Sequence, residues 1–188
     1  MQTLLDGGRI TQLLAAIADK IVADPSIILK SKSGEGSGTS DGAVALVGIR
    51  SRGELLAQRL AVELCGRLKV PQIDVGALDI TMYRDDLASR RAITIPKGTD
   101  MNFRLDGRPV VLIDDVLETG RSVRAALDAL VAYGRPRLIR LAVLVDRGRH
   151  EFPIAADYVG INITEVAAEQ KIRVRLKPTD SEDRVSLE

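Results

Sequence analysis

Apolar residues follow two different periods along this chain, and their alternation predicts a sheet flanked by helices. Continuous apolar runs, typical of strands buried on both faces, occur at residues 43–49 and 110–113, and residues 138–145 are again strand-like. Helical spacing of apolar residues marks residues 10–22, 54–68 and 121–132. Because strands and helices alternate, we expect an α/β fold with a mostly parallel sheet and helices on both faces.

The remaining segments are more polar and predict shorter elements. Further strands are expected at residues 71–80, 157–161 and 172–176. Residues 81–107 carry only short alternating pieces and predict a β-hairpin or an arm that extends from the core. The charged tail, residues 179–188, is predicted to fray.

Composition narrows the class of protein without defining its function. The 188 residues show no internal repeat, so we expect one domain, 1–188, with the first helix inside residues 1–30. The single cysteine, Cys65, excludes an internal disulfide and favours a cytoplasmic protein. From the lengths of the apolar runs, no membrane span is expected. The net charge of +1 favours no partner, and aromatics at 3% make base-stacking surfaces unexpected.

The segment from Val110 to Ser122 carries the strongest indication of chemistry. Four apolar residues run into Asp114 and Asp115, and a turn with Thr119 and Gly120 precedes the next helix. A buried strand would deliver the two acids to the carboxyl edge of a sheet, where a helix N-terminus can hold an anion. Helix capping by Thr119 beside two solvated aspartates is the simpler alternative. Together, however, these groups fit a sugar phosphate.

A second strand-to-helix turn repeats this arrangement at Arg50-Ser51-Arg52-Gly53. Arginine and glycine after a strand are common, so this turn alone predicts little. Since both turns follow parallel strands, both should lie at one edge of the sheet. Arg52 and nearby backbone donors could then hold a second anion.

The acidic turn resembles the phosphoribosyl-pyrophosphate (PRPP) signature of type I phosphoribosyltransferases. Residues 79–87 (DITMYRDDL) and the DDVLxTGR pattern of residues 114–121 narrow the resemblance to the PyrR family of pyrimidine-operon regulators. Residues 141–148, 151–154 and 156–160 extend it. The resemblance covers nearly all of the chain from Ala43 to about Ile163.

This resemblance implies a fold, an activity and partners. The expected fold is that of type I phosphoribosyltransferases, with residues 81–107 as a mobile arm and a small hood. The expected activity joins uracil to PRPP with Mg²⁺, giving UMP and diphosphate. The family is also known for binding the pyrimidine-operon mRNA leader, and it forms homodimers and tetramers. A purine phosphoribosyltransferase on the same scaffold stays open as an alternative, as does an RNA-binding nucleotide sensor with little catalysis.

The resemblance also implies roles for individual residues. Asp114 and Asp115 would bind the ribose hydroxyls and are the candidate Mg²⁺ ligands, and Arg52 and Arg84 would assist diphosphate departure. Asp146 and Arg147 are the candidates for the wall of the base site. The expected PRPP- and nucleotide-binding residues are Ser51, Arg52, Gly53, Asp114, Asp115, Val116, Leu117, Glu118, Thr119, Gly120, Arg121 and Ser122.

The chain departs from RNA-binding members of the family at several positions of their RNA-binding face. The pair Arg149-His150 is reversed, Ala155 and Ile161 replace an arginine and a lysine, and Ala15 and Asp19 lie near the places of a threonine and a histidine. Fewer cations mean fewer phosphate contacts. We therefore expect catalysis to be kept and RNA binding to be weakened or shifted.

Overall fold

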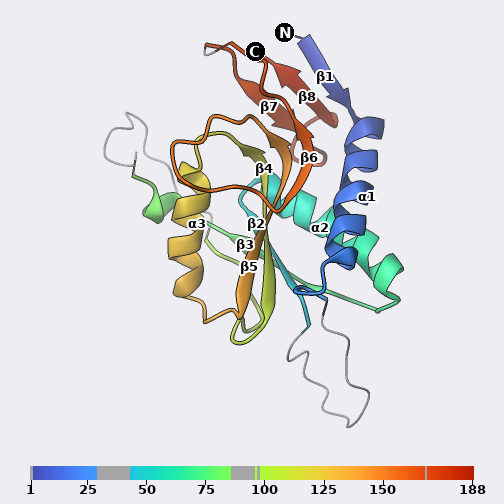
Figure 1. The fold of residues 1–188 in the computed structure, drawn as a ribbon, viewed down its shortest axis with the longest axis vertical. Coiled ribbons are helices and arrows are strands. Elements are labelled where there is room, and N and C mark those ends of the chain that lie inside the picture. Colours follow the sequence, from blue (N-terminus) through green and yellow to red (C-terminus); the bar gives the residue numbers. More distant parts are fainter. Residues whose placement is uncertain (1, 29–42, 86–95, 97, 168) are drawn as a thin grey trace.

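A parallel five-stranded sheet forms the centre of the molecule (Figure 1). The structure is a computed structural model that describes residues 2–28, 43–85, 96, 98–167 and 169–188. Its strand order is β3-β2-β4-β5-β6, and every neighbouring pair is parallel. The strands are β2 (Ala45–Ile49), β3 (Asp74–Leu78), β4 (Pro109–Leu117), β5 (Leu138–Asp146) and β6 (Tyr158–Asn162). The predicted mostly parallel sheet is confirmed.

Helices cover both faces of this sheet, as expected. Helices α1 (Gly7–Ala23) and α2 (Arg52–Leu68) lie on one face, and α3 (Arg121–Val131) lies on the other (Figure 1). Alternate strand residues divide between the two layers. Leu46 and Val111 join the core under α1 and α2, whereas Val47 and Leu112 join the core under α3. None of the helices in the described ranges is both long and apolar enough to cross a membrane.

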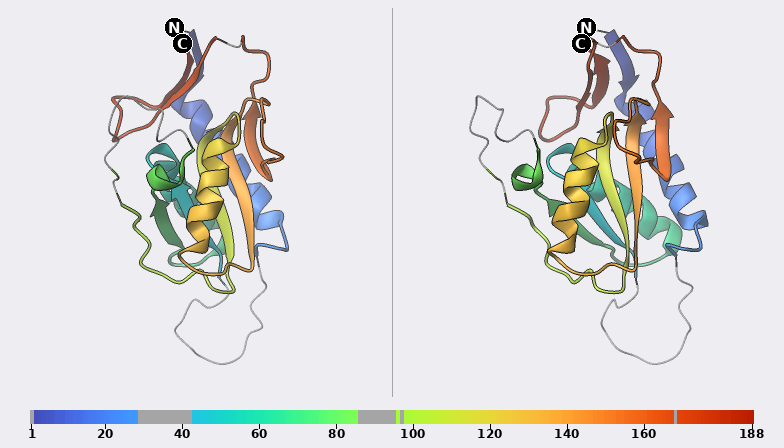
Figure 2. Two further views of the ribbon diagram at one scale, coloured as in Figure 1. Left: turned by 90° about the vertical axis from the view of Figure 1, so that its left-hand side faces the viewer. Right: turned by 60° about the vertical axis from the view of Figure 1, so that its left-hand side comes forward.

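A small antiparallel sheet closes over one end of the main sheet and forms the expected hood. Its order is β1 (Gln2–Asp6), β8 (Arg184–Leu187) and β7 (Ile172–Arg175), so the two ends of the chain lie side by side (Figure 2). The prediction that residues 179–188 fray is wrong, because β8 is the central strand and Val185 is fully buried. Because β8 is stabilised by pairing with the other end of the chain, no local hydrophobic periodicity in the sequence indicates this strand.

The expected arm, residues 81–107, is only partly described. Residues 81–83 form the 3-10 helix η1 (Thr81–Tyr83), whereas residues 86–95 and 97, including the alternating stretch that suggested a hairpin, lie outside the described residues. Residues 100–105 do not extend from the core. Asp100 and Ala77 exchange two backbone hydrogen bonds of 2.8 Å, and Leu105 is fully buried. The prediction of an arm that extends to residue 107 is therefore wrong for its C-terminal part, residues 100–105.

Candidate functional site

The carboxyl ends of β2, β4 and β5 meet at one edge of the sheet, and the predicted site residues cluster there. Strand β4 does not end at Ile113 as predicted but continues through the two acids to Leu117. Its pairing with β2 stops at Ile113, whereas its pairing with β5 continues to Asp146. The acids therefore extend β4 along one neighbour only, beyond the end of its pairing with β2.

The two carboxylates occupy a poorly hydrated position. Asp114 is 8% exposed, and its Oδ1 accepts the Asp115 N–H at 2.9 Å. Burial raises the pKa of Asp114 well above its ordinary value, and the neighbouring Asp115 charge adds to the increase while Arg84 opposes it. Burial also raises the pKa of Asp115, against the opposing effects of its hydrogen bond with Asp114 and the charge of Arg52. Such a pair is stabilised by hydroxyl donors or a cation.

The turn after β4 presents backbone donors to an open cavity. A cavity of about 300 Å³ is lined by Arg84, residues 114–123 and Ile172. Helix α3 begins at Arg121 after Gly120, whose φ of +85° favours glycine and which has no side chain to cap the helix. Thr119 caps only the first N–H group, since its Oγ1 accepts from the Arg121 N–H at 3.3 Å. The helix N-terminus is free to bind an anion.

The loop after β5 supports this turn from behind. The N–H groups of Glu151 and Phe152 both donate to the Thr119 carbonyl, at 3.0 and 3.2 Å. A Cβ on Gly120 would lie 3.3 Å from the Phe152 Cβ, so the loop is tightly packed against the turn. No local sequence pattern predicts this supporting role of residues 151–154, which are part of the family resemblance, because the role depends on a tertiary contact.

The second predicted turn lies beside the first. A Cβ on Gly53 would lie 2.4 Å from the Ile113 carbonyl oxygen and 3.3 Å from the Asp114 Cα, so α2 begins directly against the acidic end of β4. Arg52 is the first residue of α2. Its Nε is buried without a hydrogen-bond partner among the described residues, and its charge opposes protonation of Asp115. Ser51, Arg52 and Gly53 are thus close to the acid pair, although they do not line the cavity.

Arg84 reaches the same site from the other side of the cavity. Its Nη1 donates to Ser122 Oγ at 3.2 Å, and its charge lowers the pKa of Asp114. The sequence places Arg84 38 residues before Ser122, so only the fold brings the two together. Two predicted cations, Arg52 and Arg84, thus flank the predicted carboxylates.

The hood contributes two residues that the sequence analysis missed. Asp180 accepts a hydrogen bond from Arg52 Nη2 at 3.1 Å. Burial acts to raise the pKa of its carboxyl, but the backbone hydrogen bond from Leu176 and the contact with Arg52 outweigh it and lower the pKa. Ile172 of β7 lines the cavity. Both lie in or near the hood sheet. Because residues 179–188 were expected to fray, the sequence did not indicate a role for Asp180.

The candidate base-site residues lie at the end of β5 but outside the lining of this cavity. Asp146 is 8% exposed, and its Oδ1 accepts from the Gly148 N–H at 2.8 Å and lies 2.9 Å from His150 Nε2. Arg147 is almost fully buried. It pairs with Glu118 and donates to the Ala167 and Gln170 carbonyls. It therefore connects the turn of residues 118–122, here called the phosphate turn, to the loop before β7.

The donor set suits Mg²⁺ only in combination with a substrate. Among the described residues, no group of three or more histidine, cysteine or acidic side chains could hold a metal. Asp114 and Asp115 nevertheless provide hard oxygen ligands, and burial raises the pKa of both carboxyls. Mg²⁺ typically binds through one or two carboxylates plus substrate phosphates, and the pair fits that pattern.

Comparison with known proteins defines the class to which this fold and site belong. A model described as the phosphoribosyl transferase domain matches residues 3–177, and the chain belongs to this family. Within it, the chain is 54% identical to the Bifunctional protein PyrR of Bacillus cereus (strain AH820) over 144 residues, which cover 76% of this chain and 79% of that protein. The homologue from Bacillus mycoides (strain KBAB4) is 53% identical over the same length. The chain is therefore a member of the PyrR family.

Solved structures confirm the fold. The hypoxanthine phosphoribosyltransferase of Trypanosoma cruzi, in complex with the product IMP, superposes with a TM-score of 0.65 over 100% of this chain and 90% of that chain, at 19% identity. The hypoxanthine phosphoribosyltransferase of Staphylococcus aureus gives a TM-score of 0.62 over 89% and 80% of the two chains, at 18% identity. At this identity, the likeness concerns the architecture alone.

Proposed function

We propose that this protein is a uracil phosphoribosyltransferase that joins uracil to PRPP, giving UMP and diphosphate. One observation carries the proposal: the buried Asp114 and the half-buried Asp115 adjoin the N-terminus of α3, which begins after a glycine, in a cavity of about 300 Å³. The sequence identity of 54% to Bifunctional protein PyrR supports the choice of a pyrimidine over a purine base.

The phosphate turn and the acid pair would hold the ribose phosphate at its two ends. Backbone N–H groups of Glu118 to Ser122 and the hydroxyls of Thr119 and Ser122 would bind the 5′-phosphate, which the helix dipole also stabilises. Asp114 and Asp115 would accept hydrogen bonds from the ribose hydroxyls. These contacts fix the sugar ring, so that its C1′ faces the base.

Diphosphate can leave only when its charge is neutralised. Arg52 and Arg84 flank the acid pair and would bind the departing oxygens. Mg²⁺, held by Asp114, Asp115 and the substrate, would supply further charge neutralisation. The bond between C1′ and the diphosphate oxygen breaks, the uracil nitrogen forms the new bond to C1′, and the proton on that nitrogen leaves.

Base selection is proposed to occur at the end of β5. Asp146 and Arg147 lie there, beyond the described lining of the phosphate cavity. Because Arg147 pairs with Glu118 and two loop carbonyls, we propose that it shapes the base site by holding the loop rather than by direct contact.

An activity assay with several bases tests the proposal. The protein, Mg²⁺ and labelled PRPP are incubated with uracil, cytosine, hypoxanthine or guanine, and nucleotide products are separated. We expect UMP alone, and little product after chelation of Mg²⁺. Preferential formation of IMP or GMP would favour a purine enzyme, and no product with any base would refute the enzymatic proposal.

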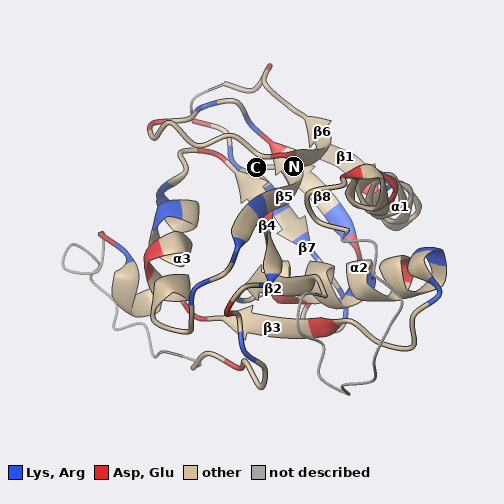
Figure 3. Cartoon of the chain, turned by 60° about the horizontal axis from the view of Figure 1, so that its bottom comes forward, with Lys and Arg blue, Asp and Glu red and all other residues tan. Residues whose placement is uncertain are grey.

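Regulation by RNA is a second candidate, because the similar proteins are named bifunctional. Two of the positions at which the chain departs from RNA-binding members supply no cation to the RNA-binding surface. Asp19 accepts a hydrogen bond from Arg67 Nε at 2.7 Å, and Ile161 packs against the hydrophobic core. On α2, the helix that packs beside α1, Figure 3 shows acidic and basic positions interspersed. We therefore propose that UMP-dependent binding of the mRNA leader is weakened.

Two measurements address the remaining partners. A gel-shift titration with the source organism's own pyrimidine-operon leader, with and without UMP, tests RNA binding, and tight UMP-dependent binding would contradict the proposed weakening. Sedimentation velocity tests the proposed homodimer or tetramer, and a monomer at micromolar concentration would contradict it.

A further inference from the structure

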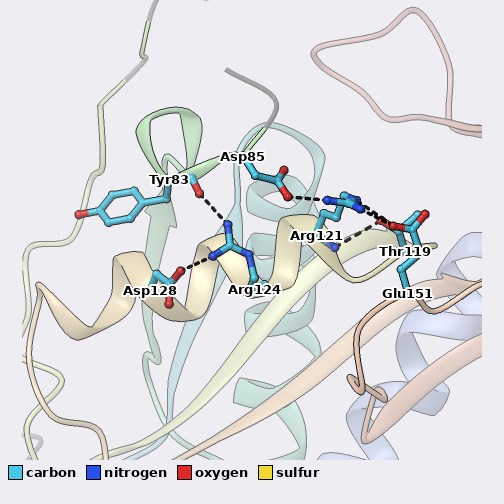
Figure 4. A network of polar contacts seen from close by, with 7 residues as sticks. All are labelled: Tyr83, Asp85, Thr119, Arg121, Arg124, Asp128 and Glu151. Carbon is cyan, nitrogen blue, oxygen red and sulfur yellow. Dashed lines mark hydrogen bonds and ion pairs between the residues drawn. The ribbon is translucent and has the colours of Figure 1, made fainter. Parts of the chain in front are cut away.

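The first turns of α3 hold Tyr83 and Asp85, the two neighbours of Arg84 in the chain (Figure 4). On one side, the Tyr83 carbonyl accepts a hydrogen bond from Arg124 Nη2 at 3.1 Å. On the other side, the Asp85 carboxylate accepts from Arg121 Nη1 at 2.5 Å. With both neighbours held, the Arg84 side chain is directed to Ser122, also in α3.

Both α3 arginines are themselves held from a second direction. Their guanidinium groups lie over the Phe152 ring, at 5.4 Å for Arg121 and 6.0 Å for Arg124. Arg121 also pairs with Glu151 through two nitrogens, at 2.9 and 2.6 Å. The loop that supports the phosphate turn therefore also supports the arginines that hold residues 83–85.

We propose that Arg121 and Arg124 are positioning residues that aim Arg84 at the diphosphate of PRPP. The proposal rests on the proposed function, since it assumes that Arg84 neutralises this leaving group. Each contact alone is partly exposed and would contribute little to stability. Their arrangement on both sides of one residue restricts where its backbone can lie, which matters for a group that must meet developing charge.

Replacing Asp85 distinguishes a charge effect from a positioning role, because the two predict opposite changes in the KM for PRPP. Its carboxylate pairs with a cavity-lining arginine, so on charge alone its removal should improve the binding of an anionic substrate. A positioning role predicts the opposite, because Asp85→Asn releases one side of the Arg84 segment. We expect the KM for PRPP to increase about fivefold, with the KM for uracil unchanged.

Glu151→Gln is the matched control. It removes the same charge from the same arginine, and the two carboxylates are similarly exposed, but the Asp85 contact remains. We expect its KM for PRPP to stay within about twofold of the unmodified protein, because the Phe152 ring and the Asp85 carboxylate still hold Arg121. A lower KM in Asp85→Asn, or equal changes in the two variants, would overturn the proposal.

A double-mutant cycle tests Arg124 independently. If Arg124 acts through Arg84, Arg124→Met should lower kcat/KM for PRPP about fivefold in the unmodified protein but less than about twofold in an Arg84→Met background. Asp128→Asn is the control, since it removes the i,i+4 partner of Arg124 and leaves the bond to Tyr83. Equal factors in both backgrounds would refute the inference.

Failure of this inference can be distinguished from failure of the proposed function. Turnover by the unmodified protein without coupling in the cycle refutes the positioning role alone. Absence of turnover refutes the proposed function, and calorimetric titration with PRPP and Mg²⁺ then measures the same coupling through affinity. Thermal melting of each variant verifies that the fold is intact.

Discussion

Asp114 and Asp115 illustrate a conflict between stability and function at the level of single residues. Burial of both carboxyls raises their pKa values, so ionising them in the ligand-free protein is unfavourable. We predict that Asp114→Asn lowers UMP formation by about 100-fold. The same variant should raise the free energy of unfolding by about 1 kcal/mol at neutral pH. Initial rates and urea denaturation measure the two effects. A variant with ordinary kinetics would contradict the role of this residue.

The raised pKa of Asp114 also predicts a pH dependence of stability. The folded state keeps this proton to higher pH than the unfolded state, whose pKa is near 3.8. The stabilisation is therefore present below that pH and lost as pH rises through the folded pKa. The difference in unfolding free energy between Asp114→Asn and the unmodified protein should grow over this range. A constant difference across the pH series would contradict the prediction.

Asp24 shows the opposite behaviour at the C-terminus of α1. Hydrogen bonds from Ser26 and then from Tyr158 are the main causes that lower its pKa from 3.8 to about 2. Its contribution is thus present above about pH 4 and lost as pH falls towards 2. Asp24→Asn should reduce stability by about 1 kcal/mol at neutral pH, and the difference should vanish near pH 2. Urea unfolding at several pH values measures it, and a difference that persists at pH 2 would contradict the assignment.

At the level of elements, the close approach of α2 to β4 depends on one glycine. A Cβ at position 53 would overlap the Ile113 carbonyl, whereas a Cβ at Gly66 in the same helix would meet nothing within 4 Å. Gly53→Ala should cost about 3 kcal/mol or more and impair PRPP binding. Gly66→Ala should stabilise by about 0.5–1 kcal/mol, because alanine favours helices. Chemical denaturation compares the pair, and equal effects would contradict the packing argument.

Elements with local periodicity could be predicted from the sequence, whereas contacts between distant segments could not. Within the part of the chain that the structure describes, the pattern of apolar residues predicted the three α-helices and the five parallel strands, since burial on a sheet leaves a regular pattern. The pattern could not reveal that β1 pairs with β8, because both strands are short and each is paired with a segment from the other end of the chain. The acid pair was predictable for the same local reason. Asp180 and the partners of Arg147 were not, since they depend on where the hood and its loop fold back.

At the level of the whole molecule, the hood makes the two chain ends part of one structure with the site. Val185 in β8 is fully buried, while Val62 on α2 is 74% exposed. The same valine-to-alanine substitution at the two positions therefore compares a buried hood residue with an exposed control. Val185→Ala should cost about 1–3 kcal/mol, whereas Val62→Ala should stay within about 0.5 kcal/mol. Because the hood carries Ile172 and the loop with Asp180, Val185→Ala should also weaken PRPP binding. Urea unfolding and PRPP titration measure both effects. If Val185→Ala matched Val62→Ala in both, the chain end would contribute nothing to the fold or to the site.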